Sequence, residues 1–234
     1  MAENYDGPQF KRVEFNSYEN EEYDLNETLK NLPQTSLTFS SGATGKAFVL
    51  SHKYFANKMC VKWIAVNPGC SNLEDIRREA EIQKMFNHQY IVPLVKKVES
   101  KNESNGEIES VFLIMPYYPL KDLFYYILDQ PNCIIQIKDV KCICKQILEA
   151  LIYMNSLNFF HNDLKMENIL IKRENGSLVA ALCDFGYTKQ IRDPKNNYNI
   201  IIYRDNQGTI SYDSPEKLLD LGCMYTFGVN FYLN

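Results

Sequence analysis

Residues 161–170, HNDLKMENIL, contain six polar side chains within eight positions, and an Ile-Leu pair follows them. His161, Asp163, Lys165 and Asn168 are two or three residues apart. The pattern predicts a short polar loop that leads into a buried strand. A carboxylate can take up a proton from a reacting group, and a nearby ammonium can neutralise negative charge that develops there. The loop is therefore a candidate for general acid–base chemistry.

Three other stretches contain residues of similar interest. GATGKA, residues 42–47, has two glycines that would let the backbone approach a phosphate without a Cβ in the way. Lys62 lies in an apolar stretch, and Glu79 follows in a predicted helix, with Glu81 as an alternative partner. Asp184 stands between a Cys and a Phe in CDFG. Taken singly, each stretch also fits an ordinary role as a hairpin turn, an edge lysine or a loop aspartate.

The first half of the chain is predicted to be a small antiparallel sheet with one helix. Residues 37–50 read as strand, glycine-containing turn and strand, and residues 58–66 as a further strand. The acids of residues 72–86 favour a helix, capped by Ser71 or Asn72. Two more strands are predicted over 91–98 and 111–118, separated by a polar hairpin over 99–110.

The second half is predicted to be a helical layer that supports a hairpin. One apolar helix face runs through residues 140–157, because five side chains fall at helical spacing. A strand at 169–171, a turn at Asn175-Gly176 and a strand within 178–186 follow the polar loop. The members of the helix face are Val140, Cys144, Ile147, Leu151 and Met154.

The composition is ordinary for a soluble globular protein, but the charge is unevenly distributed. The 234 residues are 45% hydrophobic and 23% charged, with a net charge of −4. Residues 1–36 contain eight acids and three bases and lack a clear period, so we expect a flexible acidic extension there. The balance gives no electrostatic footprint for nucleic acid or an anionic membrane, and neither is an expected partner.

The cysteines and the N-terminal residues favour a cytoplasmic location, with a nuclear one left open. Seven cysteines show no disulfide or zinc spacing, which is typical of reduced thiols. The first ten residues have no basic and apolar regions of a signal peptide. No run of 18 apolar residues occurs, so no membrane span is expected.

The order of these motifs resembles a eukaryotic protein kinase domain of the Ser/Thr type, over roughly Leu37 to Gly228. GATGKA, the strand lysine, the helix glutamate, HNDLKMEN, DFG and GTISYDSPE follow one another at similar intervals. The resemblance implies an α+β, two-lobed fold with a small antiparallel-sheet N-lobe (37–115), a hinge (116–121) and an incomplete helical C-lobe (122–234). It also implies ATP and Mg²⁺ as cofactors and protein Ser or Thr hydroxyls as substrates.

The resemblance assigns nucleotide contacts to residues along the first half. Gly42 and Gly45 would approach the phosphates, and Lys62, oriented by Glu79, would contact them. The adenine and ribose would be bound by a set of seven residues. These are Ala47, Cys60, Met115, Pro116, Tyr118, Asp122 and Leu170.

The resemblance also assigns the catalytic and metal roles. Asp163 would orient the substrate hydroxyl and accept its proton, while Lys165 would steady the transferring phosphate. Asn168 and Asp184 would hold Mg²⁺, which prefers oxygen ligands. Lys62 and Glu79 complete the catalytic set, and His161 and Phe185 are expected to pack as supports.

Three features depart from the family pattern. Gln83 falls where the family packs an apolar side chain, and a neutral Asn162 stands where an Arg is frequent. Residues 217–234 match the family's central helix poorly, which predicts an incomplete C-lobe and a partner that covers it. These departures keep an alternative open, in which the chain is a pseudokinase-like ATP-binding or interaction module without turnover.

Overall fold

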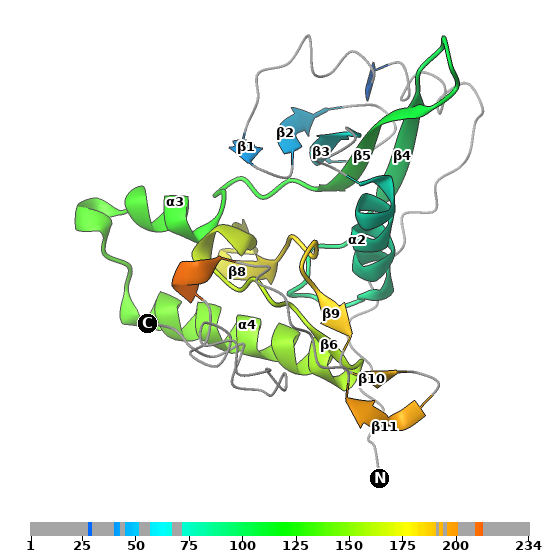
Figure 1. Ribbon diagram of the computed structural model, residues 1–234. Helices are drawn as coiled ribbons and strands as arrows, with labels where there is room; N and C mark the ends of the chain where they lie inside the picture. The colour runs from blue at the N-terminus through cyan, green and yellow to red at the C-terminus, as the bar shows by residue number, and fades with distance from the viewer. Residues whose placement is uncertain are drawn as a thin grey trace. The chain divides into compact units, whose positions relative to one another are not determined.

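The computed structural model describes residues 28–29, 40–42, 45–51, 57–66, 72–190, 192–193, 196–200 and 209–212 (Figure 1). The chain divides into two compact units. Unit 1 comprises residues 1–80 and 93–117, and unit 2 comprises 81–92 and 118–234. The sequence had suggested a boundary at 115–122, whereas this division also groups 81–92 with unit 2.

Unit 1 is built on a five-stranded antiparallel sheet in the order β1-β2-β3-β5-β4. The central strands are rich in β-branched and aromatic residues, which suit a pleated, buried surface. Helix α2 belongs to unit 1 as far as residue 80. The bounds are β1 Ser40–Gly42, β2 Gly45–Leu50, β3 Met59–Ala65, α2 Leu73–Met85, β4 Lys96–Lys101 and β5 Ile108–Pro116.

The two faces of this sheet have separate apolar cores, because successive side chains of a strand point to opposite faces. On β5, Val111 and Leu113 pack with Ile76 and Ala80 of α2. Phe112 and its alternating neighbours pack on the other face, where Leu29 is fully buried. Leu29 lies within the predicted flexible extension, so this part of the extension is packed into unit 1.

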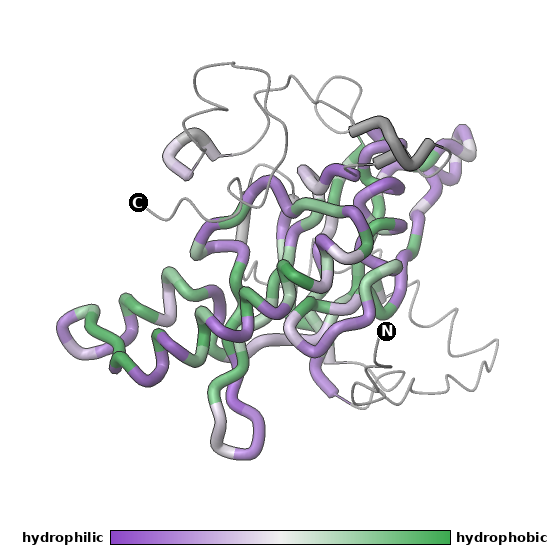
Figure 2. Tube along the Cα trace, turned by 90° about the horizontal axis from the view of Figure 1, so that it is seen from below, coloured by the Kyte–Doolittle hydropathy of each residue, from purple (hydrophilic) through white to green (hydrophobic). Residues whose placement is uncertain are grey.

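Unit 2 contains a long helix, α4, that packs against the β7–β8 hairpin. The alternation of hydrophobic and hydrophilic residues along the described elements is visible in Figure 2, as expected of elements with one buried face. The hairpin turn has Asn175 and Gly176 with φ of 49° and 81°, the left-handed values that a two-residue hairpin turn needs. The main elements are α3 Leu123–Leu128, α4 Ile137–Ser156, β6 Phe159–Phe160, β7 Ile169–Glu174, β8 Ser177–Leu182 and β9 Lys189–Gln190.

Five short elements complete the described part of unit 2. They are the 3₁₀ turns η1 Pro131–Cys133, η2 Met166–Asn168 and η3 Ile210–Tyr212, and the β10 Arg192–Asp193 and β11 Asn196–Ile200 pair. β6, which precedes the polar loop, pairs with β9, which follows the DFG turn. The polar loop and the DFG turn therefore lie between two paired strands. Among the described residues, no helix combines the length and apolar character that crossing a membrane requires.

The predicted elements are largely present, with two corrections. The strand predicted over 91–98 begins only at Lys96, since Pro93 has no N–H to give to a ladder; Ile91 forms an isolated bridge to Leu182 instead. The polar hairpin is shorter than predicted, because β4 ends only at Lys101 and β5 already begins at Ile108. Helix α3 was not predicted.

Candidate active site

The first part of the site is an ion pair within unit 1. Lys62 Nζ on β3 donates to Glu79 Oε1 on α2 at 2.7 Å, and the two side chains are 15% and 9% exposed. Asn72 caps α2, since its Oδ1 accepts from the Glu74 backbone N–H at 3.1 Å. Of the two partners considered from the sequence, Glu79 is the one that is used, because Glu81 is exposed. Ser71 lies outside the described residues.

The same face of the sheet collects other residues assigned to the nucleotide. Ala47 pairs with Lys62 across β2 and β3, and Cys60 pairs with Met115 across β3 and β5. By strand alternation these four side chains share one face, opposite the face that holds Phe48 and Phe112. Burial raises the pKa of the Cys60 thiol to about 11 against the opposing charge of Lys62, so this Cys is an apolar filler rather than a thiolate.

Gly45 has a structural reason to be glycine besides any phosphate contact. Its φ is +137°, and an added Cβ would lie 2.4 Å from the carbonyl oxygen of Trp63 on β3. Gly42 pairs with Gly45 at the end of the β1–β2 ladder. The two residues between them lie outside the described part of the chain. Pro116 ends β5 and pairs with Met59.

In unit 2, residues 118–122 run along β7. The Lys121 carbonyl accepts from Ile171 N at 2.8 Å, and Asp122 forms a bridge with Leu170. Tyr118 is buried, and burial raises its pKa. Asp122, the residue assigned to the ribose, is the N-cap of α3: its Oδ1 accepts from Tyr125 N at 2.9 Å. Burial raises its pKa against the opposing effect of this hydrogen bond.

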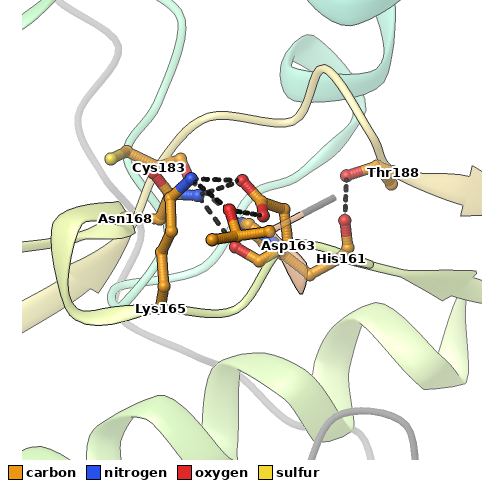
Figure 3. Close-up of polar contacts among 7 residues, drawn as sticks. His161, Asp163, Lys165, Asn168, Cys183 and Thr188 are labelled. Carbon is orange, nitrogen blue, oxygen red and sulfur yellow. Dashed lines mark hydrogen bonds and ion pairs between the residues drawn. The ribbon is translucent and has the colours of Figure 1, made fainter. Parts of the chain in front are cut away.

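Asp163 is the centre of the polar loop and is only 5% exposed (Figure 3). Asn168 Nδ2 donates to the Asp163 backbone oxygen at 2.8 Å and to its Oδ2 at 3.0 Å. Lys165 Nζ lies 2.9 Å from the same Oδ2. Thr209 Oγ1 donates to Asp163 Oδ1 at 2.7 Å and accepts from Lys165 Nζ at 2.8 Å. The carboxylate is thus held from both sides, with a hydroxyl against one oxygen.

The charge of Lys165 is secured by this network. Burial alone would disfavour the ammonium, but its hydrogen bond and ion pair with Asp163, with the charges of Asp184 and Glu167, outweigh burial and raise the Lys165 pKa. Thr209 belongs to GTISYDSPE, the last of the motifs that carry the family resemblance. Its contact with Asp163 spans 46 positions, and no local pattern indicates it.

Asp184 stands at a sharp reversal of the backbone just after β8. Its φ is +64°, a left-handed value that is uncommon for a residue other than glycine. The neighbouring Phe185 is fully buried against Phe86 and His161, with ring centroids 5.2 and 5.4 Å apart. Asp184 is thus only partly buried, whereas the next residue, Phe185, belongs to the core.

His161 packs as a support. It is fully buried, and burial lowers its pKa, so the ring is neutral. Nε2 lies 3.0 Å from the Cys183 carbonyl oxygen, and because a carbonyl only accepts, Nε2 carries the proton. Thr188 Oγ1 donates to the His161 backbone oxygen at 3.5 Å. These contacts join the polar loop to the residues that flank Asp184.

Asn162 has a backbone reason for its identity. Its φ is +65°, and Asn tolerates this region better than most residues. The side chain is buried at 6% exposure, and neither its oxygen nor its nitrogen has a hydrogen-bond partner among the described residues.

The donor atoms present in unit 2 fit Mg²⁺. Both hydrogen bonds of Asn168 Nδ2 go to Asp163, so the amide oxygen of Asn168 is the atom that would bind a cation. Asp184 supplies a carboxylate. Mg²⁺ commonly takes one or two protein oxygens and completes its shell with water and phosphate, which suits this pair. Among the described residues, no group of three or more His, Cys, Asp or Glu side chains could hold a metal by itself.

A sheet lysine paired with a helix glutamate, and an Asp–Lys–Asn loop beside an Asp-Phe-Gly turn, are the marks of a kinase-like domain. A family model of the protein kinase domain matches residues 37–232, and the chain belongs to this family. The predicted family and α+β, kinase-like fold class are confirmed. The prediction of an incomplete C-lobe rests on residues 217–234, which lie outside the described residues.

Three curated proteins illustrate the relationship. The chain is 30% identical over 192 residues to the mitochondrial serine/threonine-protein kinase ppk24 of Schizosaccharomyces pombe, covering 76% of this chain and 40% of that protein. It is 27% identical over 176 residues to the serine/threonine-protein kinase TIO of Arabidopsis thaliana, covering 75% and 12%. It is 27% identical over 149 residues to the maternal embryonic leucine zipper kinase of Danio rerio, covering 64% and 20%. The chain thus spans 12% to 40% of the length of these relatives.

Proposed function

We propose that the chain transfers the γ-phosphate of ATP to Ser or Thr hydroxyls of proteins, with Mg²⁺ as cofactor. The observation that carries this proposal is the hydroxyl of Thr209, which donates to Asp163 at 2.7 Å while it accepts from Lys165 at 2.8 Å. The Asp163 carboxylate and the Lys165 ammonium are therefore able to engage one aliphatic hydroxyl together. A substrate hydroxyl needs these two partners when it attacks a phosphoryl group.

In the proposed reaction, the substrate hydroxyl oxygen forms a bond to the γ-phosphorus and gives its proton to the Asp163 carboxylate. The bond from the γ-phosphorus to the oxygen that bridges it to the β-phosphate breaks, and ADP leaves. Lys165 neutralises charge on the transferring group, and Lys62, oriented by Glu79, binds phosphate oxygens. Mg²⁺, held by Asn168 and Asp184, would neutralise phosphate charge.

The Ser/Thr preference is supported by Lys165 and Thr209 and by the similarity to serine/threonine-protein kinases of Schizosaccharomyces pombe and Arabidopsis thaliana. The test is an assay with ATP labelled at the γ-phosphate and three peptide mixtures, in which the only hydroxyl residue is Ser, Thr or Tyr. We expect label in the Ser and Thr mixtures and none when EDTA removes the metal. Label confined to the Tyr mixture would contradict the substrate class.

Absence of label in every mixture, together with retained ATP binding, would contradict the transferase proposal. That result would favour a nucleotide-binding module without turnover.

A further inference from the structure

Gln83 is a buried amide at the end of α2, at a position where the family pattern has an apolar residue. It is 2% exposed, and its Nε2 donates to the backbone oxygen of Val92 at 2.9 Å. The residue after Val92 is a proline, so the acceptor is the carbonyl of an X-Pro peptide in an irregular segment. The burial of a polar group is thereby compensated, and the side chain fixes a specific backbone atom.

The segment that Gln83 contacts is in turn hydrogen-bonded to the end of β8. Val92 N donates to the Leu182 carbonyl at 2.8 Å, and Leu182 N donates to the Tyr90 carbonyl at 2.9 Å. Leu182 is the last residue of β8 and is fully buried. Both edges of β8 are therefore bonded here, one to β7 and the other to residues 90–92.

Asp184 lies two positions after Leu182, and Phe185 follows it. Phe86, which directly follows α2, packs against Phe185 with ring centroids 5.2 Å apart. The segments before and after Asp184 are thus both held from the end of α2. Leu182 is held through Val92, which accepts a hydrogen bond from Gln83. Phe185 is held through its contact with Phe86. An apolar side chain at position 83 could pack there but could not bond to the Val92 carbonyl.

We propose that Gln83 is a positioning residue that couples the end of α2 to the metal-binding Asp184 through Val92 and Leu182. The inference rests on the proposed function only in assigning Asp184 to Mg²⁺. Loss of the Gln83 amide leaves the Val92 carbonyl without this donor and loosens the segment that pairs with β8. The direction of the Asp184 carboxylate then becomes less well defined, although the residue itself is unchanged.

A second buried glutamine provides a matched control. Gln146 on α4 donates to the Leu178 carbonyl at 3.0 Å and accepts from Ala180 N at 2.7 Å. It holds the same strand at an earlier point, through Leu178 and Ala180 rather than through residues 90–92. Gln83→Met and Gln146→Met make the same chemical change at these two places. Gln83→Leu is a second variant for position 83, since the family pattern carries an apolar residue there.

The first readout is hydrogen exchange of single amides in the folded protein, which requires no catalytic activity. In Gln83→Met and Gln83→Leu we expect the Val92 and Leu182 amides to exchange about tenfold faster or more, with Ala180 changed much less. In Gln146→Met we expect the Ala180 amide to exchange faster, with the Val92 and Leu182 amides changed much less. Unchanged exchange at Leu182 in both position-83 variants would overturn the coupling.

The second readout is the Mg²⁺ concentration that gives half-maximal phosphate transfer. We expect it to rise severalfold in the position-83 variants, with KM for the peptide unchanged. Faster exchange without a change in Mg²⁺ dependence would reduce Gln83 to a structural residue and overturn the positioning role. If the wild-type chain transfers no phosphate, the proposed function fails; Mg²⁺–nucleotide affinity then replaces the rate as the second readout.

Discussion

Helix α2 is joined to the sheet of unit 1 by two ion pairs of nearly equal length but different character. Lys62 and Glu79 meet at 2.7 Å through one contact, with side chains 15% and 9% exposed. Arg77 donates to both oxygens of Glu99 at 2.8 and 2.6 Å, and its side chain is 44% exposed. The pair with the better hydrogen-bond geometry is the one in contact with solvent.

The difference shows that geometry alone does not identify a functional pair. Arg77 uses its guanidinium fork on one carboxylate, whereas Glu79 engages one of the three donors of the Lys62 ammonium. Hydrogen bonding to Arg77 lowers the Glu99 pKa to about 2. An exposed pair of this kind contributes little to stability, while a buried lysine is costly unless it is paired, as Lys62 is with Glu79. The following predictions test this contrast.

The largest expected difference is in turnover. Lys62→Met should lower kcat/KM for phosphate transfer by about 10²–10³-fold, because a positioned cation is lost from the developing phosphate charge. Arg77→Met removes the exposed cation of the other ion pair of α2 and should change the rate less than twofold. Steady-state assays on folded variants, verified by circular dichroism, provide the measurement. Equal losses in the two variants would show that both pairs act only through the stability of unit 1.

Nucleotide-linked stability should separate the same variants. Mg·ATP at 100 times its Kd should stabilise the wild-type chain and Arg77→Met by about 2.7 kcal/mol. Lys62→Met and Asp184→Asn should show a much smaller shift at that concentration, since phosphate and metal contacts are weakened. Thermal melts with and without millimolar Mg·ATP measure this. A wild-type melt that does not move would contradict nucleotide binding.

A smaller effect is expected from activation-segment phosphorylation, because Asn162 supplies no cation for a phosphate. Phosphatase treatment of active protein should lower the rate less than tenfold. A larger loss, restored by rephosphorylating one hydroxyl between residues 184 and 216, would refute this and direct attention to Lys189 or Arg192. The position of Asn162 at φ +65° already accounts for the residue without a regulatory role.

The smallest effect concerns the pH dependence of stability through Glu99. Its pKa in the folded chain is about 2, below its ordinary value of 4.5. The contribution of ionised Glu99 to the free energy of unfolding is therefore present above pH 4.5 and is lost as the pH falls toward 2. Urea unfolding should show Glu99→Gln slightly less stable than wild type at pH 6, with a smaller difference at pH 3.5. A difference that grows as the pH falls would contradict the assignment.

The sequence predicted the parts of the site that depend on local pattern. The cap and the acids of residues 72–86 indicated α2, and Glu79 followed as the partner of Lys62 from the motif order. Helix α3 was missed because its sequence LFYYIL is apolar at every position, so no 3.6-residue period appears. Exposed Tyr125 and Leu128 show that its outer face is apolar too.

Specific contacts between different segments could not be predicted from the sequence. The bond from Gln83 to Val92 ends on a backbone carbonyl in an irregular segment, and the Thr209–Asp163 bond joins residues 46 positions apart. Gln83 departs from the family pattern, and the sequence could not show that its buried amide has a partner. The positive φ values of Asn162 and Asp184 were not predicted either, although Asn and Asp tolerate this region better than most residues.

The central claim is that Asp163 acts on the substrate hydroxyl and not on the nucleotide. The direct measurement compares wild type with Asp163→Asn in two assays on the same preparations: γ-phosphate transfer to a Ser/Thr peptide, and calorimetric titration with Mg·ATP. The account predicts that transfer falls by about 10²-fold or more while the ATP affinity changes little. Equal transfer by the two proteins, or a parallel loss of ATP binding, would contradict it.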